Sequence, residues 1–261
     1  MRRILLVSFV AVLLTLPSLI LAGPNEGVYL AVHGNVDGIE TNGDIFGSIT
    51  IPANAADFSP TATPDAGGVE WFQLIVVSPP ENTPNFNTIV FGIPTAYQNI
   101  TSIDFWGPIA PGGAAIPLPI YTSGWPNGPG TRGAAVSWAP GCFYEHLQPV
   151  FYFGCYSYNA GYVALGAHPV QGGVVVDCGS NPQTDTFTSY PVFSVGGTAY
   201  GPCCVPVMEE GDPNCLILTM EDCTLADGSF LNGQWVTCKN PDPCYVPVQQ
   251  TTWGSIKRTY Q

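Results

Sequence analysis

Positive charge is scarce in this sequence. Its 261 residues include six lysines and arginines against 19 aspartates and glutamates. A surface with so few cations cannot neutralise a run of phosphates and is repelled by anionic membranes. The composition therefore excludes a nucleic acid as a partner. Charged residues make up only 10% of the chain, so surface ion-pair networks of the hyperthermophile kind are not expected either.

The sequence motifs of common reaction centres are also missing. The chain has no G-x-S-x-G, no H-E-x-x-H and no C-x-x-C, and all three histidines precede residue 170. Serine hydrolases, zinc proteases, thioredoxin-like redox pairs and tetrahedral zinc sites each depend on one of these patterns. We therefore expect no metal or cofactor, and no catalytic centre is evident.

A helical apolar period is absent from residue 27 to about 200. Short runs rich in β-branched and aromatic residues alternate there with turn clusters such as NVDG, PDAGG and GSNPQ, which is typical of antiparallel strands. The sequence predicts an all-β fold, a two-sheet antiparallel β-sandwich followed by a small disulfide-rich module. The proline-rich residues 107–133 are either a functional loop or an irregular edge passage. The predicted strands are Val28–His33, Ile45–Ile51, Val69–Ser78, Thr88–Ile93, Ile100–Trp106, Ala134–Trp138, Pro149–Tyr158, Val174–Asp177 and Phe187–Val195.

The N-terminus has the parts of a secretory signal peptide. Arg2 and Arg3 form a basic start, residues 4–16 are almost wholly apolar, and Ala22 puts a small residue at the expected cleavage point. The alternative is a retained transmembrane anchor, which the break at Pro17 disfavours. We expect a secreted protein, extracellular or at the cell surface, that is not an integral membrane protein after cleavage.

Composition divides the chain into four parts. Residues 1–22 are the signal peptide, 23–200 the β-sandwich domain, 201–245 the cysteine-rich module, and 246–261 a linker and C-terminal tail. The mature chain keeps four basic residues and all 19 acidic ones, a formal charge of −15.

The cysteines of the module are expected to form disulfides. An exported segment of this length buries too little surface to fold alone, and each bridge adds about 2–4 kcal/mol. A bond between adjacent cysteines would be strained, so the first two should have different partners. Thr219 is expected to begin a short helix that stops at Gly228, before a hairpin with Asn232 and Gly233 at its turn. The six cysteines are Cys203, Cys204, Cys215, Cys223, Cys238 and Cys244.

Three further cysteines lie in the sandwich domain, Cys142, Cys155 and Cys178. We expect one disulfide among them and one buried thiol. A reactive thiol would need a nearby cation or helix N-terminus to lower its pKa, and this chain offers few cations.

Three segments of the chain resemble an uncharacterised family of secreted proteins from environmental bacteria. GPCCVP…NC…T.EDC….G.F..G.W..C..PDPC resembles their cysteine-rich repeat, ACC…G.C…T..DC...GG...G.G..C.P.PC. Residues 150–179, VFYFGCYSYNAGYVALGAHPVQGGVVVDCG, are similar to their VYWFAGY.Y…G..PHP.QGG…D segment, and TTWGSIKRTY is similar to their TTWG.IK.LYR ending. The matches cover about half of the mature chain. It departs from the family in a longer 203–215 spacing and in Gln261, where the family has arginine. The resemblance implies export and a sandwich-like body, and it implies no activity.

One set of residues could supply acid–base catalysis, namely Glu145, His146, His168 and Asp177. Such catalysis needs groups within hydrogen-bond reach of one proton. Neighbours in a strand point to opposite faces, so Glu145 and His146 should not act together. The alternative, structural or surface roles for all four, is the one we expect.

The loop DGIETNGD concentrates oxygen donors on a short glycine-bearing segment, Asp37, Glu40, Asn42 and Asp44. Calcium takes six to eight such oxygens. The loop lacks the spacing of an EF-hand, so a solvated turn is the alternative to a calcium site.

Several tryptophans could form a stacking platform for sugars, Trp71, Trp106, Trp125 and Trp138. Most should belong to the core, since Trp71 lies in the most apolar predicted strand. Trp125, in a glycine- and proline-rich loop, is expected to be exposed.

Two functions remain open. The first is a secreted or cell-surface structural, adhesion or ligand-binding protein, whose partner would be a cell-envelope component, the export machinery or a glycan. The alternative is an extracellular hydrolase that acts on polysaccharide through paired carboxylates in a groove.

The C-terminal tail has the pattern of a short amphipathic helix. Trp253, Ile256 and Tyr260 share one face, and Lys257 and Arg258 fall near its C-terminal end. Such a short helix is marginal alone, so we expect a recognition tag that becomes ordered on a partner. The alternative is a tail that docks on its own domain.

Deleting residues 251–261 tests the tail. We expect the melting temperature of the body to stay unchanged while the fraction of protein that remains cell-associated changes, because a tag contributes to recognition and not to the core. Thermal unfolding and cell fractionation measure the two effects. A deletion that unfolds the body would show that the tail is a structural element.

Overall fold

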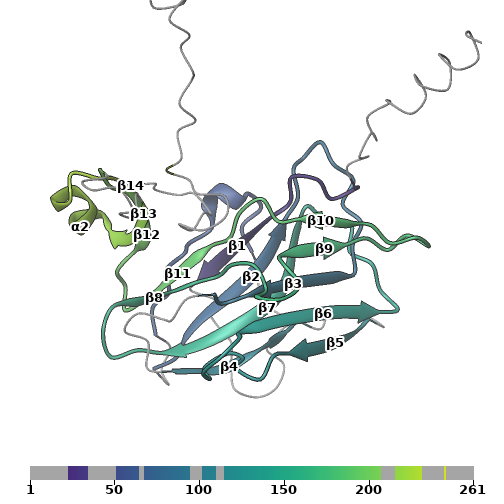
Figure 1. The fold of residues 1–261 in the computed structure, drawn as a ribbon, viewed down its shortest axis with the longest axis horizontal. Coiled ribbons are helices and arrows are strands. Elements are labelled where there is room, and N and C mark those ends of the chain that lie inside the picture. Colours follow the sequence, from purple (N-terminus) through teal and green to yellow (C-terminus); the bar gives the residue numbers. More distant parts are fainter. Residues whose placement is uncertain are drawn as a thin grey trace, which may run out of the picture.

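The chain folds as an all-β sandwich followed by a small disulfide-rich unit (Figure 1). Two sheets of antiparallel strands pack face to face, one in the order β1-β2-β7-β4 and the other in the order β10-β9-β3-β6-β5. This confirms the fold class predicted from the sequence. The computed structural model describes residues 23–34, 51–64, 68–94, 102–109, 115–206, 215–230 and 244.

The elements of the sandwich are β1 (Tyr29–Gly34), the 3-10 helix η1 (Ala55–Asp57), β2 (Glu70–Val77), β3 (Thr88–Gly92), β4 (Ser102–Pro108), β5 (Ile116–Tyr121), β6 (Gly133–Ala139), β7 (Leu147–Tyr156), β8 (Gly161–Ala164), β9 (Val174–Val176), β10 (Thr184–Thr186) and β11 (Val192–Val195). Strands β8 and β11 form a separate antiparallel pair.

The core lies between the two sheets and is rich in aromatic rings. Phe72 from β2, Phe153 from β7 and Phe91 from β3 are all fully buried. The ring of Phe153 lies 5.3 Å from that of Phe193 and 5.1 Å from that of Phe151. Alternate residues of each strand point inward, but β2 is buried at every position, as its unbroken apolar run indicates.

The other face of the four-stranded sheet is covered by the chain itself. Ile75 and Val77 of β2 pack with Phe58, which follows η1, and with the half-buried Ile51 and Ala55. The row of aliphatic side chains on β5 is exposed, as described below.

Two predicted segments differ from the structure. The proline-rich passage 107–133 contains the edge strand β5, because prolines are tolerated where one side of a strand has no partner. The predicted strand Phe187–Val195 is shorter, since only Val192–Val195 pairs, with β8. The predicted strand Ile45–Ile51 lies outside the described residues, apart from Ile51, which is not in a strand.

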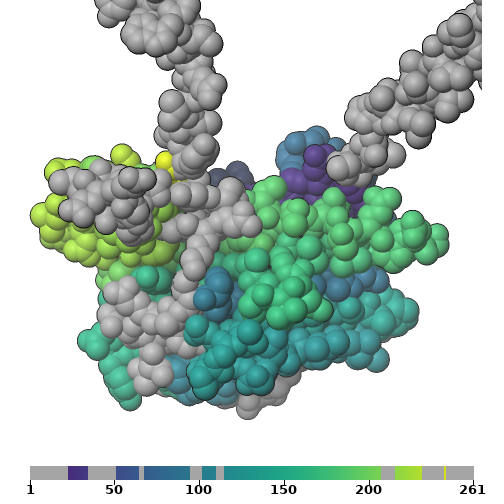
Figure 2. Space-filling model, in the orientation of Figure 1, coloured from purple at the N-terminus to yellow at the C-terminus, as the bar shows by residue number. Residues whose placement is uncertain are grey.

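The disulfide-rich unit contains β12 (Tyr200–Cys204), β13 (Cys215–Thr219), α2 (Met220–Leu225) and β14 (Ser229–Phe230), and β12 is the central strand of its sheet. In Figure 2 it forms a yellow-green lobe beside the body. Thr219 caps α2 as predicted, since its Oγ1 accepts a hydrogen bond from Asp222 N at 3.1 Å. The predicted hairpin at Asn232 and Gly233 lies outside the described residues.

Disulfides join the cysteines in the way the spacing suggested. Cys203 bonds to Cys223 and Cys204 bonds to Cys244, so the adjacent pair has different partners. Cys215 is also disulfide-bonded, and Cys238 lies outside the described residues.

The sandwich has one disulfide and one buried thiol. Cys142 on the β6–β7 connection bonds to Cys178 after β9. Cys155 of β7 is free and fully buried in the core. Burial raises the pKa of its thiol far above the usual range, with Glu70 and Asp104 acting in the same direction, so the sulfur stays protonated and unreactive.

Replacing Phe153 by alanine should lower the free energy of unfolding by about 3–5 kcal/mol, because a fully buried ring between the sheets is lost. Urea denaturation of the mature chain measures the effect. Tyr158→Ala is the control, since Tyr158 is 90% exposed and its loss should change the value by less than about 0.5 kcal/mol. Equal effects of the two changes would contradict this description of the core.

Candidate functional site

The outer face of the five-stranded sheet is the candidate site. The strand register shows which residues share this face, because their neighbours in β3, β6 and β9 belong to the core and the pairing extends the face to β5 and β10. The outer face consists of Ile116, Leu118 and Ile120 of β5, Ala135, Ser137 and Ala139 of β6, Thr88 and Val90 of β3, Val174 and Val176 of β9, and Thr184 and Thr186 of β10.

No residue of the outer face carries a charge. All its side chains are aliphatic or bear a hydroxyl, in a chain with 19 acidic residues. The polar groups in its centre satisfy each other, since Thr88 Oγ1 and Ser137 Oγ share a hydrogen bond of 2.8 Å. The outer face is therefore uncharged on a strongly acidic protein.

The outer face has a ridge of large aliphatic side chains beside a strand of small ones. The ridge is the row Ile116, Leu118 and Ile120, whose side chains are 63%, 55% and 73% exposed. The neighbouring strand β6 has small side chains, such as Ala135 and Ser137, opposite the ridge residues. The alternation I-x-L-x-I in IPLPIY is the sequence signal for this ridge, and the two prolines within it obscured the strand.

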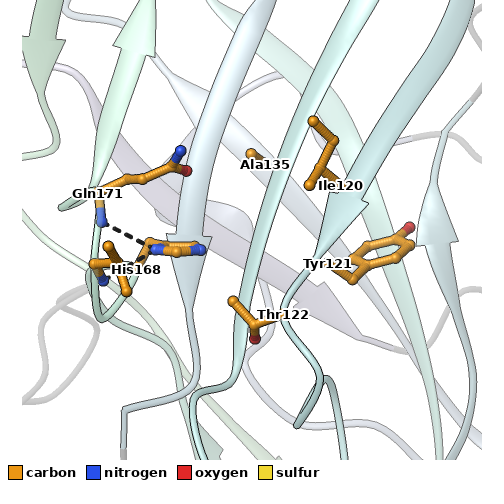
Figure 3. A pocket seen from close by; sticks show the side chains of 7 residues that line it. Ile120, Tyr121, Thr122, Ala135, His168 and Gln171 are labelled. Carbon is orange, nitrogen blue, oxygen red and sulfur yellow. Dashed lines mark hydrogen bonds between the residues drawn. The ribbon is translucent and has the colours of Figure 1, made fainter.

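The turn from His168 to Gly172 closes one end of the outer face (Figure 3). The imidazole lies over Gly133 so closely that a Cβ there would come within 2.1 Å of the ring. His168 Nδ1 accepts hydrogen bonds from Val170 N and Gln171 N, both at 3.1 Å. The proton therefore belongs on Nε2, and burial lowers the pKa of the ring, which favours the neutral form.

Between this turn and the ridge lies a hollow of about 240 Å³, lined by Ile120, Tyr121, Thr122, Ala135, His168, Val170 and Gln171. In Figure 3, His168 extends from the turn toward Ala135, while Tyr121 points away from it. Val170 is 76% exposed. The hollow can take an aliphatic side chain from a partner.

The free edge of β5 cannot pair with another strand through the usual ladder. Thr122 N donates to Gly133 O of β6 at 3.0 Å, so even-numbered residues of this stretch direct their amides to β6. Pro117 and Pro119 therefore stand where amides would face outward, and proline has none to offer. Strand addition at this edge is blocked.

The structure does not bring the four acid–base candidates together. No hydrogen bond links any two of them, and all four are among the described residues. Glu145 and His146 are exposed beyond the end of β6. His168 holds its own turn, and Asp177 Oδ1 accepts hydrogen bonds from Gly179 N at 2.9 Å and Gln183 N at 3.1 Å. His168 and Asp177 therefore have structural roles.

The tryptophans do not form an exposed platform. Trp71 and Trp138 are buried, and Trp106 is half-buried. The expectation that Trp125 is exposed is wrong, since only 8% of it is accessible. Its loop turns back, with Trp125 N donating to Thr122 O, and its ring packs edge-on against Phe91.

Two further sets of predicted residues lie outside the described part of the chain. They are the calcium candidates Asp37, Glu40, Asn42 and Asp44, and the tail residues Trp253, Ile256, Lys257, Arg258 and Tyr260. Within the described ranges, no three His, Cys, Asp or Glu side chains are grouped as ligands for a metal ion. None of the helices in those ranges has the length and apolar character needed to cross a bilayer.

Glu70 is a buried carboxylate that the sequence did not single out. It lies in β2 at the end of the core, and both its oxygens accept a hydrogen bond from Gly196 N at 2.9 Å. Gly196 lies between β11 and β12, so this contact fixes the start of the disulfide-rich unit. Burial raises the pKa of Glu70, and the hydrogen bond from Gly196 opposes the shift.

No protein-family model matches the sequence, and neither the curated proteins nor the solved structures gave a match. The site must therefore be interpreted from its own chemistry.

Replacing Glu70 by glutamine should change how stability depends on pH. Because the raised pKa means that the folded state holds the proton more tightly, the contribution of Glu70 is present below its ordinary pKa and is lost as the pH rises through the raised value. Glutamine cannot ionise, so the variant does not lose this contribution. Its stability should therefore rise relative to that of the wild type from about pH 4 to 7. Urea denaturation across this range measures the difference.

Glu145→Gln is the control, because Glu145 is exposed and its replacement removes no buried contact. A constant difference between Glu70→Gln and the wild type would show that burial does not control the protonation of Glu70.

Proposed function

We propose that this protein is an exported structural or adhesion protein of the cell surface, which acts by binding and has no catalytic role. The observation that carries the proposal is the uncharged outer face with its exposed aliphatic ridge. We further propose that a second copy of this chain occupies that face. Membership of the secreted family that the cysteine and tail motifs resemble is part of the same proposal.

Charge favours a second copy as the occupant. The mature chain has 19 acidic and four basic residues, so two copies repel each other over most of their surface. The outer face has no ionised side chain to desolvate, and it is therefore where two copies can meet without like-charge contacts. Apolar burial then supplies the free energy.

The surface shape of the outer face is self-complementary. In a two-fold pair, the Leu118 ridge of each copy can lie along the small residues of β6 in the other, such as Ala135. Strand spacing and rise give the face roughly 400 Å² per copy. If the face is treated as flat, a pair would bury roughly 800 Å² in total, which is near the lower limit of specific interfaces. The expected dimer is weak and depends on concentration.

Other occupants fit the outer face less well. Glycans stack on aromatic rings, and none of the outer-face residues is aromatic. A polysaccharide hydrolase needs two carboxylates facing a groove, whereas the buried carboxylates Glu70 and Asp177 and the half-buried Asp185 accept hydrogen bonds from backbone amides. Several disulfides are compatible with an extracellular setting.

Sedimentation velocity of the mature chain, from about 1 to 200 µM, tests the proposal. We expect a monomer–dimer equilibrium that persists in 1 M NaCl, because apolar contacts are not screened. Leu118→Asp places a charge in the ridge and should raise the dissociation constant at least about tenfold. Cell fractionation should show reduced retention of the same variant.

Leu225→Asp is the matched control, because Leu225 of α2 is 78% exposed and lies away from the outer face. It should leave dimerisation unchanged. A wild-type protein that stays monomeric throughout, or equal effects of the two substitutions, would overturn the self-association. Reduced retention of Leu118→Asp with a monomeric wild type would identify a different occupant. Turnover in a broad hydrolase screen would overturn the binding role.

A further inference from the structure

The first described residue of the chain is held by a carboxylate from the far end of the sandwich domain. Gly23 N donates to Asp185 Oδ1 at 3.0 Å, and Asn25 N donates to Asp185 Oδ2 at the same distance. Asp185 is the central residue of β10, the edge strand of the five-stranded sheet on the side opposite β5. The two carboxylate oxygens thus bind two amides of one turn.

The turn itself is fixed on its other side. The Asn25 side chain is fully buried, with Nδ2 donating to Asn85 O at 3.1 Å and Oδ1 accepting from Asn85 N at 3.0 Å. Glu26 N donates to Gly23 O at 3.2 Å. The Gly23 nitrogen is therefore held in place by contacts with the sandwich domain.

A side chain at this position would displace the Asp185 carboxylate. A Cβ on residue 23 would come within 2.2 Å of Asp185 Oδ2 and 2.6 Å of Oδ1. The clash involves the carboxylate that binds the nitrogen, so a larger residue could be accommodated only by giving up the contact. Gly23 also follows Ala22, the small residue at the end of the apolar N-terminal stretch.

We propose that Asp185 is the receptor for a new N-terminus created by cleavage between Ala22 and Gly23. A peptidase of the export pathway would hydrolyse that peptide bond with one water molecule, which leaves a carboxylate on Ala22 and an amine on Gly23. The amine takes up a proton near neutral pH, because an α-amino group has a pKa of about 8. The nitrogen that donated one amide hydrogen becomes an ammonium group 3.0 Å from a carboxylate oxygen.

Processing would therefore strengthen this contact. Hydrogen bonds between ionised groups are about twice as strong as neutral ones. The uncleaved chain has only the amide hydrogen bond, whereas the mature chain has an ion pair at the edge of the five-stranded sheet. This inference concerns maturation and stands independently of the binding role of the outer face.

The first test is the N-terminus of the exported protein. Intact mass and N-terminal sequencing should identify Gly23 as the first residue, and any other start would overturn the proposal. The second test is a thermodynamic cycle on purified protein that begins either at Gly23 or at Ala22. In the chain with the extra residue, the Gly23 nitrogen is again an amide and the ammonium group is displaced.

Asp185→Asn should lower the equilibrium constant for folding at least about tenfold in the chain that begins at Gly23, because an ionised partner is lost. In the chain that begins at Ala22, the same change should lower the logarithm of the equilibrium constant for folding by less than half as much. Asp104→Asn, at an exposed carboxylate, is the control and should act equally in both chains. Equal effects of Asp185→Asn in the two chains would overturn the ion pair.

Discussion

The packing of aromatic rings between the two sheets is the interaction on which the rest of the structure depends. Phe72, Phe91 and Phe153 are fully buried between the sheets, and these rings hold together strands that are distant in the sequence. Once this core has formed, the two outward surfaces differ. Residues 51–58 pack on the β1–β2 part of one of them, and the other leaves the Leu118 ridge exposed.

The scarcity of cations explains how the buried acids are accommodated. A buried carboxylate needs hydrogen bonds or a positive partner, and this chain supplies backbone amides in place of lysine and arginine. Glu70 accepts from Gly196, Asp177 from Gly179 and Gln183, and Asp185 from Gly23 and Asn25. Each carboxylate therefore fixes a turn or a chain junction. These three acids of the sandwich therefore have structural roles.

Much of the fold follows from local sequence, whereas the site does not. Short apolar runs between turn clusters predicted β2 and β7, and Thr219 marked the start of α2, because both signals act over a few residues. The outer face depends on register between strands that begin at Thr88, Ile116 and Gly133, which no local pattern reveals. The contact of Gly23 with Asp185 spans 162 residues. Trp125 was misplaced because a glycine- and proline-rich loop gave no sign that its ring would reach the core.

The buried thiol of Cys155 has a consequence for oxidative folding. The chain has nine cysteines, an odd number, so complete pairing within one molecule must leave one sulfur out. An accessible unpaired thiolate would attack neighbouring disulfides and scramble them, or link two molecules covalently. In β7 the leftover sulfur is enclosed by the aromatic core and kept protonated. Collapse of the sandwich thus removes one competitor from disulfide exchange, and an even number of cysteines remains to be joined.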